Sequence, residues 1–146
     1  MIITLRPATE ADREFSRQAH HTAYYDTIVK QFGPFDEVQQ DGFFTEAWDA
    51  CPHWMVEFKG QTCGYVSFEE KSGCMFVNEL VIQPDFHGQG IGAAFIRIMK
   101  DKAAEAGKPL RLSMLLMNTA YDFYIKQGFT ETSRDTKSMY MEWQPV

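Results

Sequence analysis

The stretch 79-ELVIQPDFHGQGIGAAFI-96 contains an apolar segment, a proline and a glycine-rich loop in direct succession. Its first residues are mostly apolar and lead to a proline, which indicates a strand that stops at Pro84. Three glycines then fall within five positions, at Gly88, Gly90 and Gly92. Glycine costs backbone entropy, so this density indicates positive φ angles or a close approach of the backbone to another group. A glycine-rich loop that leads into a helix N-terminus is a device for binding anions.

The rest of the chain predicts a single mixed α/β domain over residues 1–146. The expected order is β-αα-βββ-α-β-α-ββ, which makes one mixed sheet of about seven strands with helices on both faces. Strands are predicted at residues 2–8, 53–60, 61–70, 74–84, 110–116, 129–133 and 137–143. Helices are predicted at residues 10–30, 36–50, 90–106 and 118–127, with Thr9 as the N-cap of the first.

Composition and charge limit the class of protein. The chain is 45% hydrophobic and 14% aromatic, which is typical of a globular protein. The net charge of −6 argues against bulk nucleic-acid binding, which needs a basic surface. Residues 1–86 carry 6 Lys/Arg and 14 Asp/Glu, whereas residues 87–146 carry 8 and 6. The acidic half suits a cationic acceptor and the other half an anionic ligand, although ordinary scatter of surface charge explains the same numbers.

The sequence lacks the patterns that are typical of membrane-spanning, secreted, disulfide-bonded and zinc-binding proteins. No apolar run approaches the ~20 residues of a membrane span, and the first residues lack the pattern of a signal peptide. Cys51, Cys63 and Cys74 form neither a disulfide framework nor a CxxC zinc pattern. We therefore expect a cytoplasmic protein with reduced thiols, no metal and no membrane partner.

Other phosphate-binding loops fit the glycine stretch less well. A Walker loop needs GxxxxGK followed by Ser or Thr, which the chain does not contain. Gly88, Gly90 and Ala93 match the Rossmann pattern GxGxxA, but the next predicted strand, 110-LRLSMLL-116, offers no acidic residue for a ribose hydroxyl. A tight strand-to-helix turn that binds nothing stays open as an interpretation.

Two motifs resemble the GNAT superfamily of acyl-CoA N-acyltransferases. The first stretch is similar to the superfamily's central motif, a Leu-x-Val-x-Pro strand followed by Arg/Gln-x-x-Gly-x-Gly/Ala. The stretch 118-NTAYDFYIKQGF-129 resembles its second motif, in which Asn and Ala precede an aromatic-Tyr pair and the helix ends at Gly-Phe. The matching residues are Leu80, Ile82, Pro84, Gly90, Gly92, Asn118, Ala120, Phe123, Tyr124, Gly128 and Phe129. The order of predicted elements also agrees, so the resemblance covers the whole chain.

The resemblance implies acetyl-CoA as a cosubstrate. The free amides at the start of the helix predicted from residue 90 would face its pyrophosphate, and the preceding strand would pair with its peptide-like arm in a gap beside 110-LRLSMLL-116. The implied contacts are Leu80, Val81, Ile82, His87, Gly88, Gln89, Gly90, Ile91, Gly92, Ala93, Asn118 and Tyr124.

Two residues are candidates for the chemistry of acetyl transfer to an amine. Glu79 is the candidate general base that removes a proton from the amine, directly or through water. Tyr124, at the family's tyrosine position, would give a proton to the departing thiolate. The alternatives are an ordinary exposed or ion-paired glutamate and a packed aromatic. No covalent enzyme intermediate is required.

His87 departs from the motif, because the superfamily usually has Arg or Gln at this position. A histidine is cationic only at and below about neutral pH. We therefore expect His87 to contact phosphate most strongly at low pH, while the backbone amides of the loop contribute at every pH.

The acceptor is expected to be a primary amine of a small molecule or a peptide. Tyr25, Phe35 and Trp48, with Tyr24, are candidates for shaping its site, because the first two helices border that site in the superfamily. His20, His21 and His53 are more often surface or packed residues than substrate contacts. A non-catalytic acyl-CoA-binding regulatory module and a nucleotide-phosphate binder are the alternative functions, and the resemblance also allows a homodimer.

Overall fold

A computed structural model describes residues 2–145, and its elements follow the predicted order. The strands are β1 (Thr4–Pro7), β2 (Trp54–Phe58), β3 (Gln61–Glu70), β4 (Met75–Ile82), β5 (Leu110–Leu115), β6 (Thr130–Arg134) and β7 (Ser138–Trp143). The helices are α1 (Arg13–Phe32), α2 (Glu37–Ala50), α3 (Ile91–Ala106) and α4 (Tyr121–Lys126), with 3-10 turns η1 (Glu10–Asp12) and η2 (Pro84–Phe86). The predicted fold class is thus confirmed.

Two α-helices begin later than predicted. Thr9 is an N-cap as predicted, and its amide donates to the Asp12 carboxylate at 2.8 Å, but the turn that it caps, Glu10–Asp12, is 3-10, so α1 begins only at Arg13. Near the other end of the chain, the side-chain oxygen of Asn118 accepts from the Ala120 amide at 2.8 Å. This bond holds a turn before Tyr121, where α4 begins.

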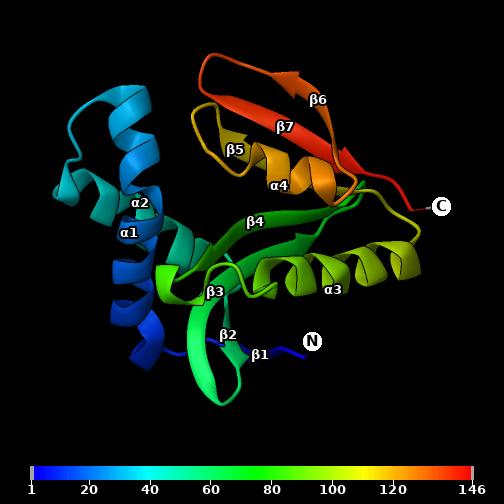
Figure 1. Ribbon diagram of the computed structural model, residues 1–146, viewed down its shortest axis with the longest axis horizontal. Coiled ribbons are helices and arrows are strands. Elements are labelled where there is room, and N and C mark those ends of the chain that lie inside the picture. Colours follow the sequence, from blue (N-terminus) through cyan, green and yellow to red (C-terminus); the bar gives the residue numbers. More distant parts are fainter. Residues whose placement is uncertain (1, 146) are drawn as a thin grey trace.

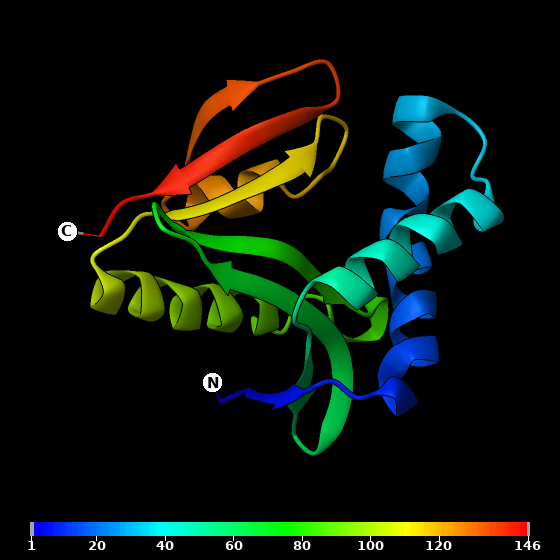
Figure 2. The ribbon, with the colours of Figure 1, turned by 180° about the vertical axis from the view of Figure 1, so that it is seen from behind.

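The seven strands form one sheet in the order β1-β2-β3-β4-β5-β7-β6. Neighbouring strands are antiparallel except β4 and β5, which are parallel and joined through α3. The helices cover both faces of the sheet: α3 and α4 lie on the face toward the viewer in Figure 1, and α2 lies on the opposite face in Figure 2.

A hydrophobic core lies on each side of the sheet. The larger one packs the sheet against α3 and α4 around residues such as Phe95, Met99 and Phe129. The smaller one packs Tyr65 and Val81 against residues of α1 and α2. The strands β2, β3 and β4 contribute residues to both cores, as the alternation of side chains across a sheet allows.

A β-bulge in β4 changes which side chains face which core. Ser67 of β3 lies opposite Glu79, but Phe68 lies opposite Val77, so Asn78 is an extra residue in β4. Val77 packs in the larger core before the bulge, whereas Val81 packs in the smaller core after it. An extra residue shifts the alternation by one position, which turns Glu79 toward α1 and α2.

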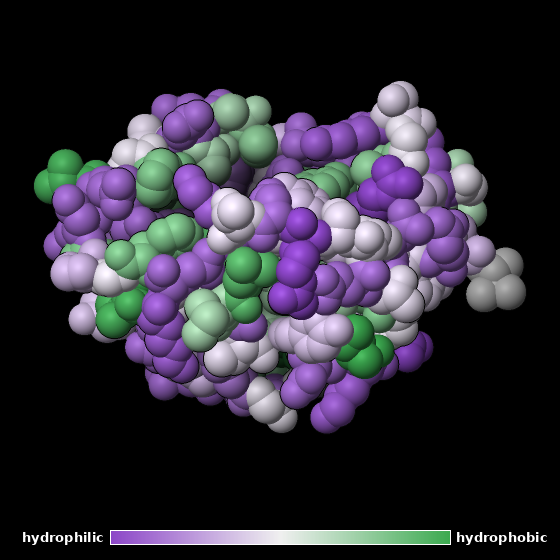
Figure 3. Space-filling model, turned by 90° about the horizontal axis from the view of Figure 1, so that it is seen from above, coloured by the Kyte–Doolittle hydropathy of each residue, from purple (hydrophilic) through white to green (hydrophobic). Residues whose placement is uncertain are grey.

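The surface seen from above in Figure 3 is mostly hydrophilic, with scattered apolar residues. Among residues 2–145, no helix combines the length and the hydropathy that crossing a bilayer requires.

Candidate active site

The parallel strands β4 and β5 separate in the middle of the sheet. They pair only from Met75 opposite Leu110 to Val77 opposite Leu112, and then diverge. The opening holds a cavity of about 190 Å³, which we call the β4–β5 cleft. It is lined by residues 77–82 of β4 and 112–115 of β5, with His87, Asn118, Ala120, Tyr124, Ala23 and Tyr24 around them. Beyond Val77, β4 remains paired with β3 alone, so its other edge faces the cleft.

The glycine loop ends at the N-terminus of α3. Gly90 is the N-cap and has a left-handed conformation with a φ of 81°, which favours glycine. Backbone hydrogen bonding in this helix begins with the amide of Ala94, which donates to the Gly90 carbonyl at 3.0 Å. No side chain caps the helix and no acidic residue lies in its first turn. The amides of Ile91, Gly92 and Ala93 therefore lack acceptors within the described chain, and such amides bind anions.

Gly92 is needed for close packing rather than for a left-handed backbone conformation. Its φ is not positive, but a Cβ at this position would lie 3.3 Å from the ring of Phe123 and 3.9 Å from Leu80. The glycine thus lets the first turn of α3 approach α4 and β4 closely.

Gly64 of β3 is a position whose role the sequence does not reveal. A Cβ there would lie 2.0 Å from the carbonyl oxygen of Val81 and 2.9 Å from the Cα of Ile82. The bare backbone at Gly64 therefore sets the position of the part of β4 that borders the cleft.

His87 lies at the cleft rather than directly at the N-terminus of α3. Its Nε2 donates a hydrogen bond to the Ile82 carbonyl at 2.7 Å, since a carbonyl can only accept. The ring is exposed and lines the cleft. Protonation would add a second donor, at Nδ1, without breaking the bond to Ile82.

Glu79 lies in the cleft and is largely buried, with its side chain 16% exposed. Burial disfavours the charged carboxylate and raises the pKa of Glu79 from 4.5 to about 7. The Tyr65 hydroxyl beside it favours the charged form and so limits this rise. That hydroxyl is fully buried, and it has no hydrogen-bond partner among the described residues. A carboxylate with a pKa near neutrality is suited to accept a proton at working pH.

Two histidines flank Glu79, and sequence reasoning did not connect them with it. Nε2 of His20 lies 4.0 Å from Oε1 of Glu79, and Nε2 of His53 lies 4.0 Å from Oε2. Burial, together with the neighbouring His21, lowers the pKa of His20 from 6.5 to about 4. Burial also lowers the pKa of His53. Both rings are therefore neutral at pH 7 and do not form ion pairs with the carboxylate.

Tyr124 reaches the same cleft from α4. Its ring is buried, and burial raises the pKa of its phenol to about 12. The phenol therefore keeps its proton over the whole neutral range. The structure thus brings Glu79 and Tyr124, which are 45 positions apart in the sequence, into the lining of one cavity.

The three aromatic candidates for acceptor contacts do not line the cleft. Tyr25 is 52% exposed, and its ring lies 5.1 Å from the ring of Phe35 in a tilted arrangement. Trp48 packs between Phe44 and His53 in the smaller core. The contact with a substrate remains a prediction for these residues.

Tyr24, by contrast, lines the cleft and a second cavity of about 570 Å³, which we call the α1–α2 cavity. This cavity is mostly apolar and aromatic, with Lys137 at its edge. His20 lines it as well, and Leu115 borders both cavities. The two cavities thus share Tyr24 and Leu115 in their linings, and His20 of the second cavity lies 4.0 Å from Glu79 of the first.

Comparisons of the sequence with known proteins agree with this geometry. The family described as the acetyltransferase (GNAT) domain matches residues 49–131, which is more than half of the chain. An uncharacterized N-acetyltransferase of Methanocaldococcus jannaschii is 33% identical over 94 residues, which are 63% of this chain and 40% of that protein. Another, from Staphylococcus saprophyticus, is 36% identical over 70 residues, which are 46% of this chain and 43% of that protein. The match thus spans less than half the length of each relative.

Solved structures share the fold over the whole chain. The PaiA N-acetyltransferase from Thermoplasma acidophilum, solved in complex with coenzyme A, has a TM-score of 0.77 at 16% identity and is covered over 99% of both chains. The ribosomal-protein-S18-alanine N-acetyltransferase from Escherichia coli has a TM-score of 0.64 at 17% identity, over 99% of this chain and 95% of that one. The family match over residues 49–131 contains both sequence motifs, and this chain belongs to the GNAT acetyltransferase domain family.

Proposed function

We propose that this protein is an N-acetyltransferase that moves an acetyl group from acetyl-CoA directly to a primary amine of a small molecule or a peptide. One observation carries the proposal: the β4–β5 cleft is lined by a carboxylate with a raised pKa, Glu79, and by a protonated phenol, Tyr124. Transfer to an amine needs a group that accepts a proton and a group that stabilises the departing sulfur, and the cleft offers one of each.

The residues around the cleft fit acetyl-CoA. The acceptor-free amides of Ile91, Gly92 and Ala93 suit its pyrophosphate, and no atom lies within 4 Å of the position that a Cβ on Gly88 would take. The cleft-facing edge of β4, at Leu80–Ile82, suits the peptide-like arm. These contacts remain proposals, as do those of Gln89 and Asn118.

The two reactive groups have different tasks. Glu79 removes the proton that the amine must lose, because free alkyl amines with a pKa of ~10.4 are protonated at pH 7. Tyr124 donates a hydrogen bond to the departing sulfur and orients it. The acceptor enters through the α1–α2 cavity, whose apolar and aromatic lining suits an amine with an apolar body.

The test is CoA release measured with a panel of amines, amino acids and peptides. The wild-type protein should release CoA with at least one acceptor, and Tyr124→Phe should bind acetyl-CoA normally while releasing CoA about 100-fold more slowly. Ile125→Val, at an exposed position in the same helix, is the matched control.

The outcomes separate the competing functions. Acetyl-CoA binding without CoA release from any acceptor would favour a regulatory acyl-CoA-binding module. Unchanged turnover in Tyr124→Phe would remove this residue from the mechanism. Protection against heat by ATP or NAD, as strong as that by acetyl-CoA, would indicate a general nucleotide-phosphate site.

A further inference from the structure

Two neutral histidines flank Glu79, but only His20 is hydrogen-bonded to a side chain that leads toward the protein surface. His53 donates from Nδ1 to the backbone carbonyl of Cys51 at 2.9 Å, so its hydrogen bonds end at the backbone. Nδ1 of His20 instead lies 2.9 Å from Nδ1 of His21. The two imidazoles are therefore linked by a hydrogen bond inside the protein.

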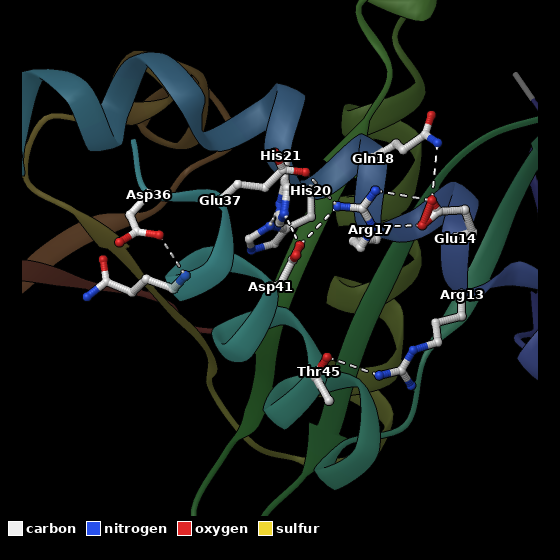
Figure 4. A network of polar contacts seen from close by, with 11 residues as sticks. Arg13, Glu14, Arg17, Gln18, His20, His21, Asp36, Glu37, Asp41 and Thr45 are labelled. Atoms are coloured by element: carbon white, nitrogen blue, oxygen red, sulfur yellow. Dashed lines mark hydrogen bonds and ion pairs between the residues drawn. The ribbon is translucent and has the colours of Figure 1, made fainter. Parts of the chain in front are cut away.

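The second imidazole contacts a carboxylate at the protein surface. Nε2 of His21 lies 2.6 Å from Oδ1 of Asp41, whose side chain is 41% exposed. Figure 4 shows His20 and His21 on α1 beside Asp41 on α2, with Arg17 on the other side of the carboxylate. A line of polar groups thus runs from buried Glu79 through His20 and His21 to Asp41.

The hydrogen bonds determine which nitrogens carry protons. Hydrogen bonds from His21 and Arg17 lower the pKa of Asp41, so it is ionised and accepts from Nε2–H of His21. When His21 is neutral, its Nδ1 is then an acceptor, and the donor must be Nδ1–H of His20. This arrangement leaves a lone pair on Nε2 of His20, directed toward Glu79 at 4.0 Å. One water or a small rotation spans such a distance.

We propose that His20, His21 and Asp41 form a proton relay that carries the proton taken up by Glu79 to solvent. The proposal rests on the proposed acetyl transfer. A turnover that begins with an ammonium breaks two N–H bonds and the C–S bond, and forms the N–C bond of the amide. One proton goes to the sulfur and the other goes to Glu79, so one proton must leave the site in each cycle.

The relay passes this proton by exchange at each ring. His20 takes it at Nε2 and gives its Nδ1 proton to Nδ1 of His21, which gives its Nε2 proton to Asp41. Asp41 loses the proton to bulk water. The starting tautomers return when each ring loses its new proton to water and takes up another at its other nitrogen, which moves no net proton. His20 lines the α1–α2 cavity, and His21 contacts Asp41 at the surface.

Other charged and titratable groups face this line from several elements. Around Glu79 these are Tyr24 of α1, His53, Tyr65 of β3 and, across the cleft, Tyr124 of α4. Around Asp41, Arg17 of α1 bridges to Glu14 and to Glu37 of α2. Among the described residues, none of these neighbours leads from Glu79 to the surface through consecutive side-chain hydrogen bonds. Removing the imidazole of His21 breaks both hydrogen bonds of the relay and therefore tests it.

The experiment compares wild-type protein, His21→Ala and Arg13→Gln in CoA release with the best amine of the panel. Arg13→Gln is the matched control, because Arg13 also ties α1 to α2, through Thr45 at 3.0 Å and Asp49 at 3.2 Å, without touching the relay. In His21→Ala we expect kcat to fall about tenfold, with an unchanged KM for acetyl-CoA and a larger solvent isotope effect in D2O. Added imidazole should restore at least half of the lost rate, while Arg13→Gln should show no imidazole response.

Two results would overturn the relay. The first is a kcat of His21→Ala that equals the kcat of Arg13→Gln. The second is a lower kcat that does not respond to imidazole at any concentration, which would mean that His21 is only structural. If the wild-type protein released no CoA with any amine, the proposed function itself would fail, and this outcome is distinguishable from both.

Discussion

The two sides of the β4–β5 cleft are built from different kinds of groups. On the side of α3, most groups are backbone amides and carbonyls, presented by a continuous segment from β4 through Gly90 to the first turn of the helix, with Tyr124 of α4 as the reactive side chain. On the side of α1 and α2, they are side chains from distant segments: His20, His53, Tyr65 and Glu79.

This difference determines how each side responds to mutation. A site made of backbone groups tolerates changes of side chain but not changes of backbone conformation or spacing. A site made of side chains depends on their identity and on their protonation states. Substitutions can therefore separate the two sides, and the following predictions are ordered by the size of the expected effect.

Gly64→Ala should have the largest effect, because its Cβ would lie 2.0 Å from the Val81 carbonyl. Overpacking of this kind costs up to about 3 kcal/mol, and it should displace the edge of β4 that serves both sides of the cleft. Urea unfolding measures the loss of stability. Gly42→Ala, where no atom lies within 4 Å of the new Cβ, is the control and should not lose stability. Equal stability of the two variants would show that β4 can move freely.

Glu79→Gln should affect only the side-chain half of the site. We expect kcat/KM to fall about 100-fold while acetyl-CoA affinity stays unchanged. In the wild-type protein kcat/KM should rise with pH and level off at about 7, where Glu79 has lost its proton. In the variant this levelling-off at pH 7 should be absent, because its residual activity depends on the free amine, whose share keeps rising up to a pH of ~10.4. Glu105→Gln, at an exposed position on α3, is the control. A wild-type profile that is flat between pH 5 and 8 would contradict the role of Glu79 as base.

The same carboxylate should also affect stability with pH. Its folded pKa of about 7 lies above the ordinary glutamate value of 4.5, so between these values the folded state holds a proton that the unfolded state has lost. The contribution of Glu79 to stability is therefore full below pH 4.5 and is lost as the pH rises to 7. The free energy of unfolding of the wild-type protein should fall relative to that of Glu79→Gln across this range, and parallel curves would contradict the raised pKa.

Gly90→Ala should affect the backbone half. An alanine at a φ of 81° costs about 1 kcal/mol, and the strain falls on the amides at the start of α3. We expect acetyl-CoA affinity, measured by calorimetry, to fall about tenfold, with the pH dependence of the remaining activity unchanged. A pH profile altered as in Glu79→Gln would show that the two halves are not separable.

His87→Arg should have the smallest effect. An arginine carries a permanent charge, so the variant should bind acetyl-CoA about threefold more tightly than the wild-type protein at pH 8, measured by calorimetry. In the wild-type protein the bond from Nε2 to the Ile82 carbonyl leaves Nδ1 for a contact with phosphate. Equal affinities would instead assign His87 to holding the edge of β4.

Prediction from sequence succeeded where the signal is local. The order of elements, the strand ending before Pro84 and the glycines before α3 follow from patterns within a few residues of one another. The starts of two helices were less accurate, because a 3-10 turn precedes α1 and the bond of Asn118 to Ala120 holds a turn before α4. Glu79 and Tyr124 could be named because they lie in or beside recognisable motifs.

The surroundings of these residues could not be predicted in the same way. The bulge at Asn78 has no sequence signature, yet it turns Glu79 toward α1 and α2. The contacts of Glu79 with His20 and His53 join residues 59 and 26 positions away along the chain. For the same reason Tyr25, Phe35 and Trp48 were reasonable candidates by element, but only the packing of each helix decides which of its faces meets the cleft.

The fold and the glycine-rich start of α3 can be predicted from the sequence, because strand periodicity, a proline stop and a glycine-rich helix start are properties of neighbouring residues. The environment of Glu79, by contrast, depends on tertiary packing. A pKa near 7 arises from burial between a sheet and two helices, and a hydrogen-bonded line from His20 to Asp41 arises from the packing of α1 against α2. Burial and convergence depend on segments that are distant in the chain, and no local pattern of residues records them.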